Sequence, residues 1–222
     1  CDTAHGLYGS SRPIINEHWE NLKKKNGGIS LVCPICGLRT CDEMDHYVPR
    51  EKMPEYSVHL TNLIPLCHDC NHDKSTHWLN DKGKRLIFNA YFDKNIPSPI
   101  IACDIKISKK DKSPQVVISV STSLDKKNDA VILSTIKKLE LIKKFQSAAD
   151  TMMRQEMVRL TASCQEQHRK YNITKKDFWE GKKNEIRKYL SHPIVWNFLD
   201  MLIYSEMLQS QIMEDWVLHD MN

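Results

Sequence analysis

Hydrophobic positions in the first half of the chain follow two different periods. Residues 13–26 carry apolar side chains at the spacing of a short amphipathic helix, which ends at an Asn-Gly-Gly sequence. Residues 86–93 are rich in aromatic side chains and predict a strand or a turn. Apolar and polar positions alternate over residues 100–107 and again over 116–120, with a polar turn between them, so these two runs predict a β-hairpin.

From residue 129 onward the hydrophobic period is helical. Residues 129–170 predict one or two long helices, and residues 175–190 predict another that begins at Thr174. Residues 193–219 follow a proline and are apolar on almost every side at first, then on one side only. A buried core helix and a docking helix for a partner protein both fit this last pattern. The whole pattern predicts an α+β fold whose rear half is mostly helical.

Composition narrows the class of protein without identifying a ligand. A chain of 222 residues holds one large domain or two small ones. Hydrophobic residues make up 41% of it, which supports a packed core and excludes intrinsic disorder. No apolar stretch reaches the ~18 uncharged residues of a membrane span, so we expect no contact with a membrane. The net charge of +4 is too small to indicate a polyanionic partner by itself.

The charges are unevenly distributed along the chain. Residues 1–99 carry 12 basic and 12 acidic side chains, whereas residues 137–188 carry 14 basic and 7 acidic ones. Residues 189–222 contain five acidic side chains and neither lysine nor arginine. The cationic middle, with its interleaved aromatic residues, fits a nucleic-acid-binding surface and fits equally well the solvated face of ordinary helices.

Four of the eight cysteines stand in two Cys-x-x-Cys pairs, Cys33 with Cys36 and Cys67 with Cys70. Two such pairs supply the four thiolates of one tetrahedral zinc site, and we expect a single structural Zn²⁺ there. Two disulfides or a redox motif are the alternatives, although a redox site needs only one pair. Thiolate ligands suit a reducing compartment, so we expect the protein in the cytoplasm.

A set of polar residues lies around the second cysteine pair. Asp45 and His46 precede a Pro at residue 49, Asn62 opens the run Asn-Leu-Ile-Pro-Leu-Cys, and Asn71 directly follows Cys70. In order and spacing these residues resemble the HNH family of endonucleases, also called ββα-metal or His-Me finger nucleases. The resemblance covers about residues 31–80. It implies a zinc-stabilised ββα-metal core and hydrolysis of nucleic-acid phosphodiester bonds, with DNA favoured over RNA as the substrate.

The resemblance also implies a role for each polar residue. Asp45 and Asn71 would supply oxygen ligands to a catalytic Mg²⁺ or Mn²⁺, because hard cations prefer oxygen. His46 would be the general base that activates water, and Asn62 would hold the loop that carries His46. The family usually has His at the position of Asn71, and His72 is the neighbouring alternative. Three further basic residues would contact phosphate or substrate: Arg50, Lys52 and Lys74.

These interpretations give a domain division in four parts: an N-terminal helical segment (1–30), the zinc-bound HNH domain (31–95), the β-hairpin (96–123) and a helical domain for nucleic acid or a partner (124–222). Residues 49–56 and the motifs after them also resemble HNH proteins encoded beside ATPases, including the nuclease of Septu-type anti-phage systems. That likeness implies an ATPase partner subunit and a role in antiviral defence. The alternative hypothesis is a non-catalytic zinc-binding module that recognises nucleic acid or protein.

Overall fold

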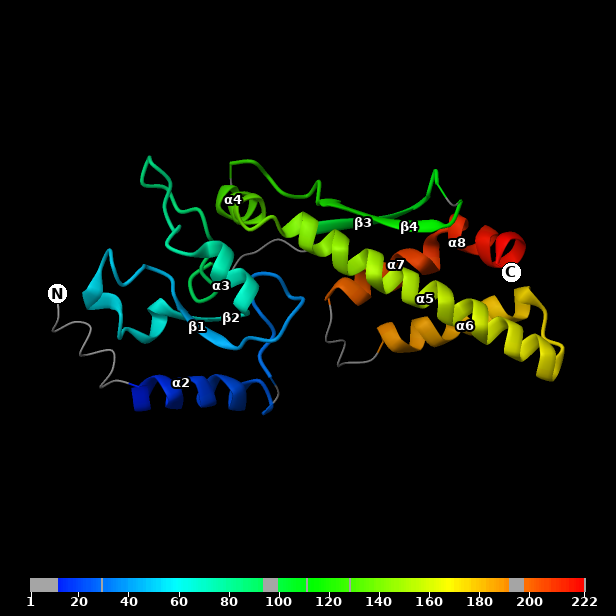
Figure 1. The fold of residues 1–222 in the computed structure, drawn as a ribbon, viewed down its shortest axis with the longest axis horizontal. Coiled ribbons are helices and arrows are strands. Elements are labelled where there is room, and N and C mark those ends of the chain that lie inside the picture. The colour runs from blue at the N-terminus through cyan, green and yellow to red at the C-terminus, as the bar shows by residue number, and fades with distance from the viewer. Residues whose placement is uncertain are drawn as a thin grey trace. The chain divides into compact units, whose positions relative to one another are not determined.

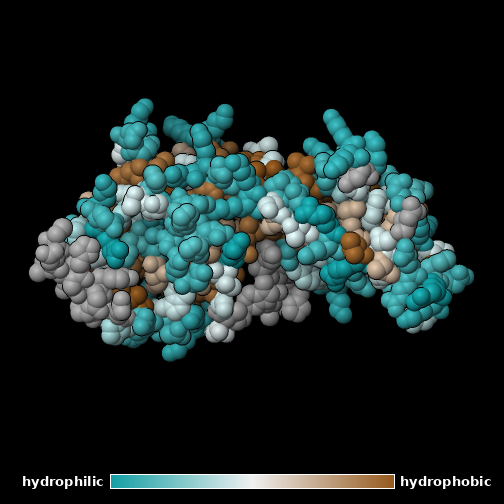
Figure 2. Space-filling view, viewed as in Figure 1, coloured by the Kyte–Doolittle hydropathy of each residue, from teal (hydrophilic) through white to brown (hydrophobic). Residues whose placement is uncertain are grey.

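The fold is that of a computed structural model, which describes residues 12–28, 30–93, 100–110, 112–127, 129–191 and 198–221. Most of the secondary structure is α-helical, and the strands form two separate two-stranded antiparallel sheets (Figure 1). This arrangement confirms the predicted α+β class. Hydrophilic residues cover most of the face of the molecule shown in Figure 2. Within the described ranges, no helix combines the length and the apolar character that crossing a membrane requires.

The chain divides into two units, and each is discontinuous in sequence. The first contains Cys1–Ser98 and Ser123–Leu141, and the second contains Pro99–Thr122 and Ile142–Asn222. The β-hairpin therefore belongs with the rear helices, since its first strand packs against two of the helices near the C-terminus. The sequence-based division treated the hairpin as a part of its own and assigned residues 124–141 to the helical domain.

The first unit consists of short elements. In chain order these are α2 (Arg12–Lys25), β1 (Glu43–His46), the 3₁₀ turns η1 (Pro54–Tyr56) and η2 (Leu60–Asn62), β2 (Leu63–Leu66), α3 (His68–Lys74) and α4 (Ala130–Lys138). The helix predicted at residues 13–26 is confirmed as α2. Residues 86–93 form turns and contain no strand, and the backbone N–H of Phe88 and the carbonyl of Leu86 are hydrogen-bonded instead to Thr135 of α4.

The second unit combines the hairpin with long helices. Its elements are β3 (Ile101–Ile107), β4 (Pro114–Val120), α5 (Leu141–Tyr171), α6 (Lys175–Leu190), α7 (Phe198–Gln209), α8 (Gln211–Asp215) and the π-helix η3 (Trp216–Asp220). The predicted hairpin and the predicted helix at 175–190 are confirmed. Thr174 caps α6, because its hydroxyl accepts a hydrogen bond from the backbone N–H of Asp177.

The C-terminal region is broken where the sequence predicts one continuous helix over 193–219. α7 ends at Gln209, and Ser210 adopts an extended conformation and caps α8 with its hydroxyl. The prediction of a single helix is therefore wrong, because a serine hydroxyl competes for the backbone N–H groups that a continuous helix would use. The predicted start, at residues 193–197, lies outside the described part of the chain.

The apolar side chains of this C-terminal region form the core of the second unit. Ile203, Met207, Met213 and Val217 are each at most 1% exposed. Burial of this extent confirms the core interpretation for these residues. Within α7, the buried residues Leu199, Ile203 and Met207 recur every four positions and so share one face of the helix.

Candidate metal centre and active site

The four paired cysteines converge in the first unit. Their sulfur atoms all lie within 4.8 Å of one another, and all four residues are buried. The Sγ atoms of Cys36 and Cys67 are 3.8 Å apart, which is too long for a disulfide and equals about the edge of a tetrahedron with Zn–S bonds of about 2.3 Å. The cluster is thus positioned to hold a metal ion, and four soft thiolates are a donor set that suits zinc.

Local backbone geometry explains how the first pair forms. The backbone N–H of Gly37 donates to the carbonyl of Cys33 at 2.8 Å, and Gly37 has a φ of 64°, a left-handed conformation that favours glycine. The turn also directs the N–H of Leu38 toward the Cys36 sulfur at 3.5 Å. The second pair lies at the start of α3, where Cys67 precedes the helix and Cys70 is in its first turn.

The strand–strand–helix sequence β1–β2–α3 presents polar side chains on facing elements. β1 and β2 pair antiparallel, with Asp45 opposite Ile64. Glu43 and Asp45 occupy alternate positions of β1, which place both carboxylates on one side of the strand. The partners of these carboxylates stand three residues apart along α3 and share a face of the helix: His68, Asn71 and Lys74.

Asp45 and Lys74 form a buried ion pair. The Lys74 Nζ atom lies 2.7 Å from Asp45 Oδ2, and the Lys74 side chain is only 1% exposed. The same ammonium donates to the carbonyl oxygens of His46 at 2.9 Å and of Ser75 at 3.4 Å, so three protein oxygens surround it. Burial raises the pKa of Asp45, and Lys74 opposes that rise.

His46 ends β1 and lies partly buried beside the loop that follows. Its Nε2 atom is 3.0 Å from the carbonyl oxygen of Ser57, and because a carbonyl only accepts, Nε2 carries the hydrogen. A neutral imidazole that donates through Nε2 has its lone pair on Nδ1. Burial lowers the pKa of His46, which favours this neutral form near pH 7.

Asn62 is buried and holds the loop after β1. Its Oδ1 atom accepts from the backbone N–H of Val48 at 2.8 Å, and its Nδ2 atom donates to the carbonyls of Val48 and Tyr56 at 3.2 and 3.1 Å. These three bonds fix both ends of the segment between residues 48 and 56, which includes Arg50 and Lys52.

A cavity of about 380 Å³ brings several of the predicted residues together. Asp45, His46, Arg50 and Asn71 all line it, although Asn71 is 25 positions beyond His46 in the chain. Lys52 is exposed and is not among the lining residues, and the buried ammonium of Lys74 is bound to protein oxygens. In this structure Arg50 is therefore the one of the three predicted phosphate-binding residues that faces the cavity.

Glu43 and His68 were not among the predicted site residues, yet both contact the site. Asn71 Nδ2 donates to Glu43 Oε2, and His68 Nδ1 lies 2.7 Å from Glu43 Oε1. The alternation of side chains along a strand is the signal that could have identified Glu43, which stands two residues before Asp45.

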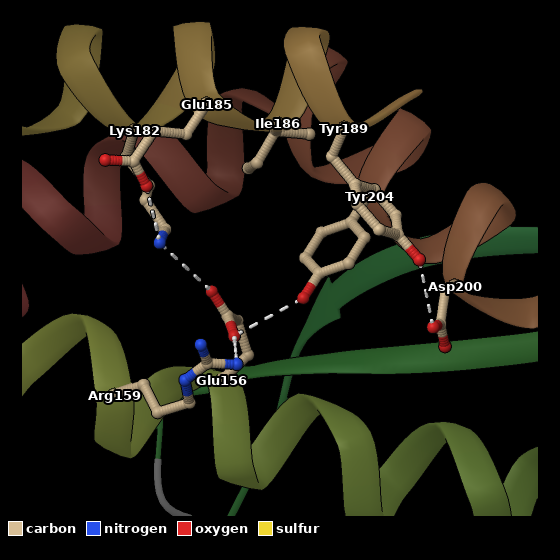
Figure 3. A pocket seen from close by; sticks show the side chains of 8 residues that line it. All are labelled: Glu156, Arg159, Lys182, Glu185, Ile186, Tyr189, Asp200 and Tyr204. Atoms are coloured by element: carbon tan, nitrogen blue, oxygen red, sulfur yellow. Dashed lines mark hydrogen bonds and ion pairs between the residues drawn. The ribbon is translucent and has the colours of Figure 1, made fainter. Parts of the chain in front are cut away.

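A second cavity, of about 290 Å³, lies within the helical unit (Figure 3). Glu156 of α5 is buried there, with Arg159 Nη1 at 3.3 Å, the Tyr204 hydroxyl at 3.5 Å and Lys182 Nζ at 4.0 Å. Burial also raises the pKa of Tyr204 to about 12. The contacts join α5, α6 and α7, so this cavity is lined by an ion-pair network that stabilises the packing of the three helices.

The aromatic and basic residues of α6 are used largely inside the same unit. Phe178 and Trp179 are buried, so their rings are not exposed for stacking on bases. Lys175 donates to the carbonyl of Met221 at 2.6 Å, and Lys183 forms ion pairs with Glu180 and Glu214. This arrangement favours the interpretation of α6 as an ordinary amphipathic helix.

Comparison with known proteins gives one short similarity. No family model and no solved structure matches the chain. Among curated proteins, the chain is 38% identical over 66 residues to the protein ea31 of Escherichia phage lambda. That match covers 29% of this chain and 22% of ea31, so the chain spans less than a quarter of the length of that relative.

Proposed function

We propose that this protein is a metal-dependent HNH endonuclease that hydrolyses phosphodiester bonds in nucleic acid, with DNA as the favoured substrate. The observation that carries the proposal is the shared cavity: Asp45, His46 and Asn71 come from two elements and line one space. An acid and an amide can bind a divalent cation, and a neutral imidazole can accept a proton from water, so these three groups around one space suit metal-assisted hydrolysis.

The donor set around this cavity fits a hard divalent cation such as Mg²⁺ or Mn²⁺. Asp45 Oδ1 and Asn71 Oδ1 are oxygen ligands of the kind that these cations prefer, and two protein ligands suffice because Mg²⁺ keeps several waters. The bound cation would supply Lewis-acid stabilisation of the charge that develops on the phosphate.

The other residues of the cavity have separate roles. His46 takes a proton from the attacking water at Nδ1, while its Nε2–H bond to Ser57 holds the ring in place. Asn62 positions the loop beside His46 without lining the cavity. Arg50 offers a guanidinium to a phosphate oxygen, and guanidinium groups match phosphate geometry well.

We further propose that the cysteine cluster holds one structural Zn²⁺. Its four sulfurs lie within 4.8 Å of one another, whereas the cavity offers oxygen and nitrogen donors. The two sites therefore differ in donor type, and a structural Zn²⁺ and a catalytic Mg²⁺ or Mn²⁺ would each have a preferred place.

The direct test is cleavage by the purified full chain. Supercoiled plasmid, linear duplex and structured RNA are each incubated with Mg²⁺ or Mn²⁺, beside a His46→Ala variant of equal zinc content. We expect metal-dependent cleavage of DNA, and a reduction of about 10²–10⁴-fold in the variant. Equal cleavage rates for both proteins would contradict the proposal.

One observation favours the alternative of a non-catalytic zinc-binding module. Asp45 Oδ2 is already paired with the buried Lys74, an arrangement that would also exist in a purely structural strand–helix contact. The two functions differ in one measurable property, because only the nuclease requires Asp45 and Asn71 for binding a divalent cation. If neither Asp45→Ala nor Asn71→Ala changes Mn²⁺ affinity, the module is the better description.

The proposal of a role in anti-phage defence, with an ATPase partner subunit and a place in the cytoplasm, rests on the resemblance at residues 49–56 and the following motifs. Co-expression of the chain with the product of a neighbouring ATPase gene, followed by size-exclusion chromatography, would test it. A stable complex is the expected result, and separate elution of the two proteins would contradict the partner.

A further inference from the structure

The amide of Asn71 has two chemically different ends, and only one of them can bind a cation. Its Oδ1 atom is an acceptor and a metal ligand, whereas its Nδ2 atom carries two hydrogens and repels a cation. A rotation of the amide by half a turn exchanges these ends. The direction of the amide therefore decides whether Asn71 can contribute to the cavity that it shares with Asp45.

Glu43 determines that direction in the structure. Asn71 Nδ2 donates to Glu43 Oε2, while the other oxygen of the same carboxylate accepts from His68 Nδ1 at 2.7 Å. With both oxygens of Glu43 accepting hydrogen bonds, Asn71 must present its donor Nδ2 to this carboxylate, and only one orientation of the amide does so.

Asn71 lines the cavity together with Asp45 and His46, whereas Glu43 is not among the lining residues. With Nδ2 turned to Glu43, the covalent geometry of the amide directs Oδ1 away from that carboxylate. Glu43 and Asp45 stand at alternate positions of β1 and have different contacts. Glu43 accepts a hydrogen bond from the Asn71 amide, and Asp45 lines the cavity.

We propose that Glu43 is a positioning residue that fixes the Asn71 amide with Oδ1 toward the cavity, so that an asparagine can serve as a ligand for a divalent cation. This inference rests on the proposed function, because it gives the same cavity a cation to bind. His68 supports the arrangement by holding the second oxygen of Glu43. Partners of metal ligands commonly contribute about 10- to 100-fold to metal affinity.

The test measures the affinity of the full chain for Mn²⁺, with the free ion detected by electron paramagnetic resonance and the zinc content verified. Glu43→Ala should weaken Mn²⁺ binding by about 10- to 100-fold. Glu43→Gln should recover much of that affinity, since its amide oxygen can still accept from Asn71. Asp42→Asn is the matched control, because it removes one exposed negative charge from the neighbouring residue and leaves the hydrogen bond intact.

A second pair of proteins, which both carry Asn71→Asp, separates the effect of amide orientation from the effect of the Glu43 charge. Asn71→Asp presents a carboxylate, whose two oxygens are equivalent, so that residue needs no partner to select its orientation. In the presence of Asn71→Asp, the change Glu43→Ala should therefore cause no decrease in Mn²⁺ affinity. An equal decrease in both backgrounds would overturn the positioning role and assign to Glu43 an attraction of charge alone.

The remaining outcomes distinguish this inference from the proposed function. If Asp45→Ala weakens Mn²⁺ binding but Glu43→Ala does not, the positioning role is wrong and the nuclease proposal stands. If Asp45→Ala and Glu43→Ala both leave Mn²⁺ affinity unchanged, the cavity holds no cation and both proposals are overturned. If both variants weaken binding and Glu43→Gln recovers it, the positioning role is supported.

Discussion

The buried ammonium of Lys74 determines how the carboxylate of Asp45 can exist inside the protein. Burial alone favours the protonated acid, whereas a cation 2.7 Å away favours the ionised form that could bind a metal. The same ammonium is bonded to the carbonyl of His46, so it also fixes the backbone at the end of β1. Lys74 therefore supports the cavity from inside the protein.

Replacing Lys74 should destabilise the first unit. Lys74→Met leaves a buried carboxylate without its cation, and breaking a buried pair in this way costs about 3–5 kcal/mol. The measurement is the urea midpoint of the zinc-loaded protein. The destabilisation should be smaller at acidic pH, where Asp45 of the variant is protonated, and the further change Asp45→Asn should reverse part of it.

Lys52→Met is the matched control for this prediction, because Lys52 is exposed on the surface. Surface substitutions of this kind usually change stability by less than about 0.5 kcal/mol. If Lys74→Met and Lys52→Met have the same urea midpoint, Lys74 does not have the structural role assigned to it.

The pH dependence of cleavage should report the environment of His46. The general base must be neutral to accept a proton, so activity falls as the pH decreases through the pKa of His46. Burial lowers this pKa below its ordinary value of 6.5, so the acidic limb of the kcat/KM profile should have its midpoint below pH 6.5. A midpoint clearly above pH 6.5 would contradict the buried, neutral imidazole.

Residue types and spacing carried the prediction of the site only in part. Each Cys-x-x-Cys pair is identified by its own short spacing, and Asp45 and Asn71 by their places in the motif that resembles the HNH family. The structure brings each of these two sets together. The burial of Lys74 could not be predicted, because it depends on the packing of α3 against β1 and not on the neighbours of Lys74 in sequence. Glu43 can be assigned to the same side of β1 as Asp45 only when the bounds of that strand are known.

At the scale of elements, the cysteine cluster joins α3 to the turn that precedes β1. The secondary structure around the cluster is short: α3 contains seven residues and β1 contains four. Such short elements have little intrinsic stability. A tetrahedral metal site between them would supply the missing stabilisation, and structural Zn²⁺ contributes about 10–16 kcal/mol in zinc-finger peptides.

Removal of one cysteine ligand should therefore unfold the first unit selectively. Cys36→Ser or Cys70→Ser should abolish zinc binding and shift the protease-sensitive sites to residues 31–93, while circular dichroism retains most of the helical signal of α5 and α6. Cys103→Ser is the control, because Cys103 lies on β3 and outside the cluster. Full zinc content in Cys36→Ser or Cys70→Ser would contradict the four-thiolate site.

The sequence predicts some helices and strands correctly and misses a break between two others. α6 was located correctly because it combines a helical period with a capping threonine, and the hairpin because its two runs alternate. The break at Ser210 was missed, since the apolar pattern continues through it and only the side-chain cap reveals it. Local signals with a physical cause were reliable, whereas hydrophobic period alone did not mark where a helix ends.

At the scale of the whole molecule, lysines of the cationic middle contact the acidic end of the chain within the second unit. Lys183 of α6 lies 3.4 Å from Glu214 of α8, and Lys175 is bonded to the carbonyl of Met221. Reversing these lysines would disturb the fold and could not give a clean test of nucleic-acid binding. The cations suited to such a test are exposed ones: Arg169, Lys176 and Lys188.

Reversal of these three exposed residues to Glu should weaken binding to duplex DNA if the second unit binds the phosphate backbone. Each phosphate interaction that the reversal removes should reduce the slope of log affinity against log salt by about 0.9. The control reverses three exposed lysines of the first unit, Lys24, Lys82 and Lys84, which changes the net charge equally. A smaller slope in the first variant alone would locate the DNA-binding surface on the second unit, because the two variants have the same total charge.

If both variants retain the slope of the unmodified protein, the excess charge of residues 137–188 serves internal pairing and solvation. Arg50 would then be the cation that binds the phosphate, and Arg50→Ala should lower DNA affinity.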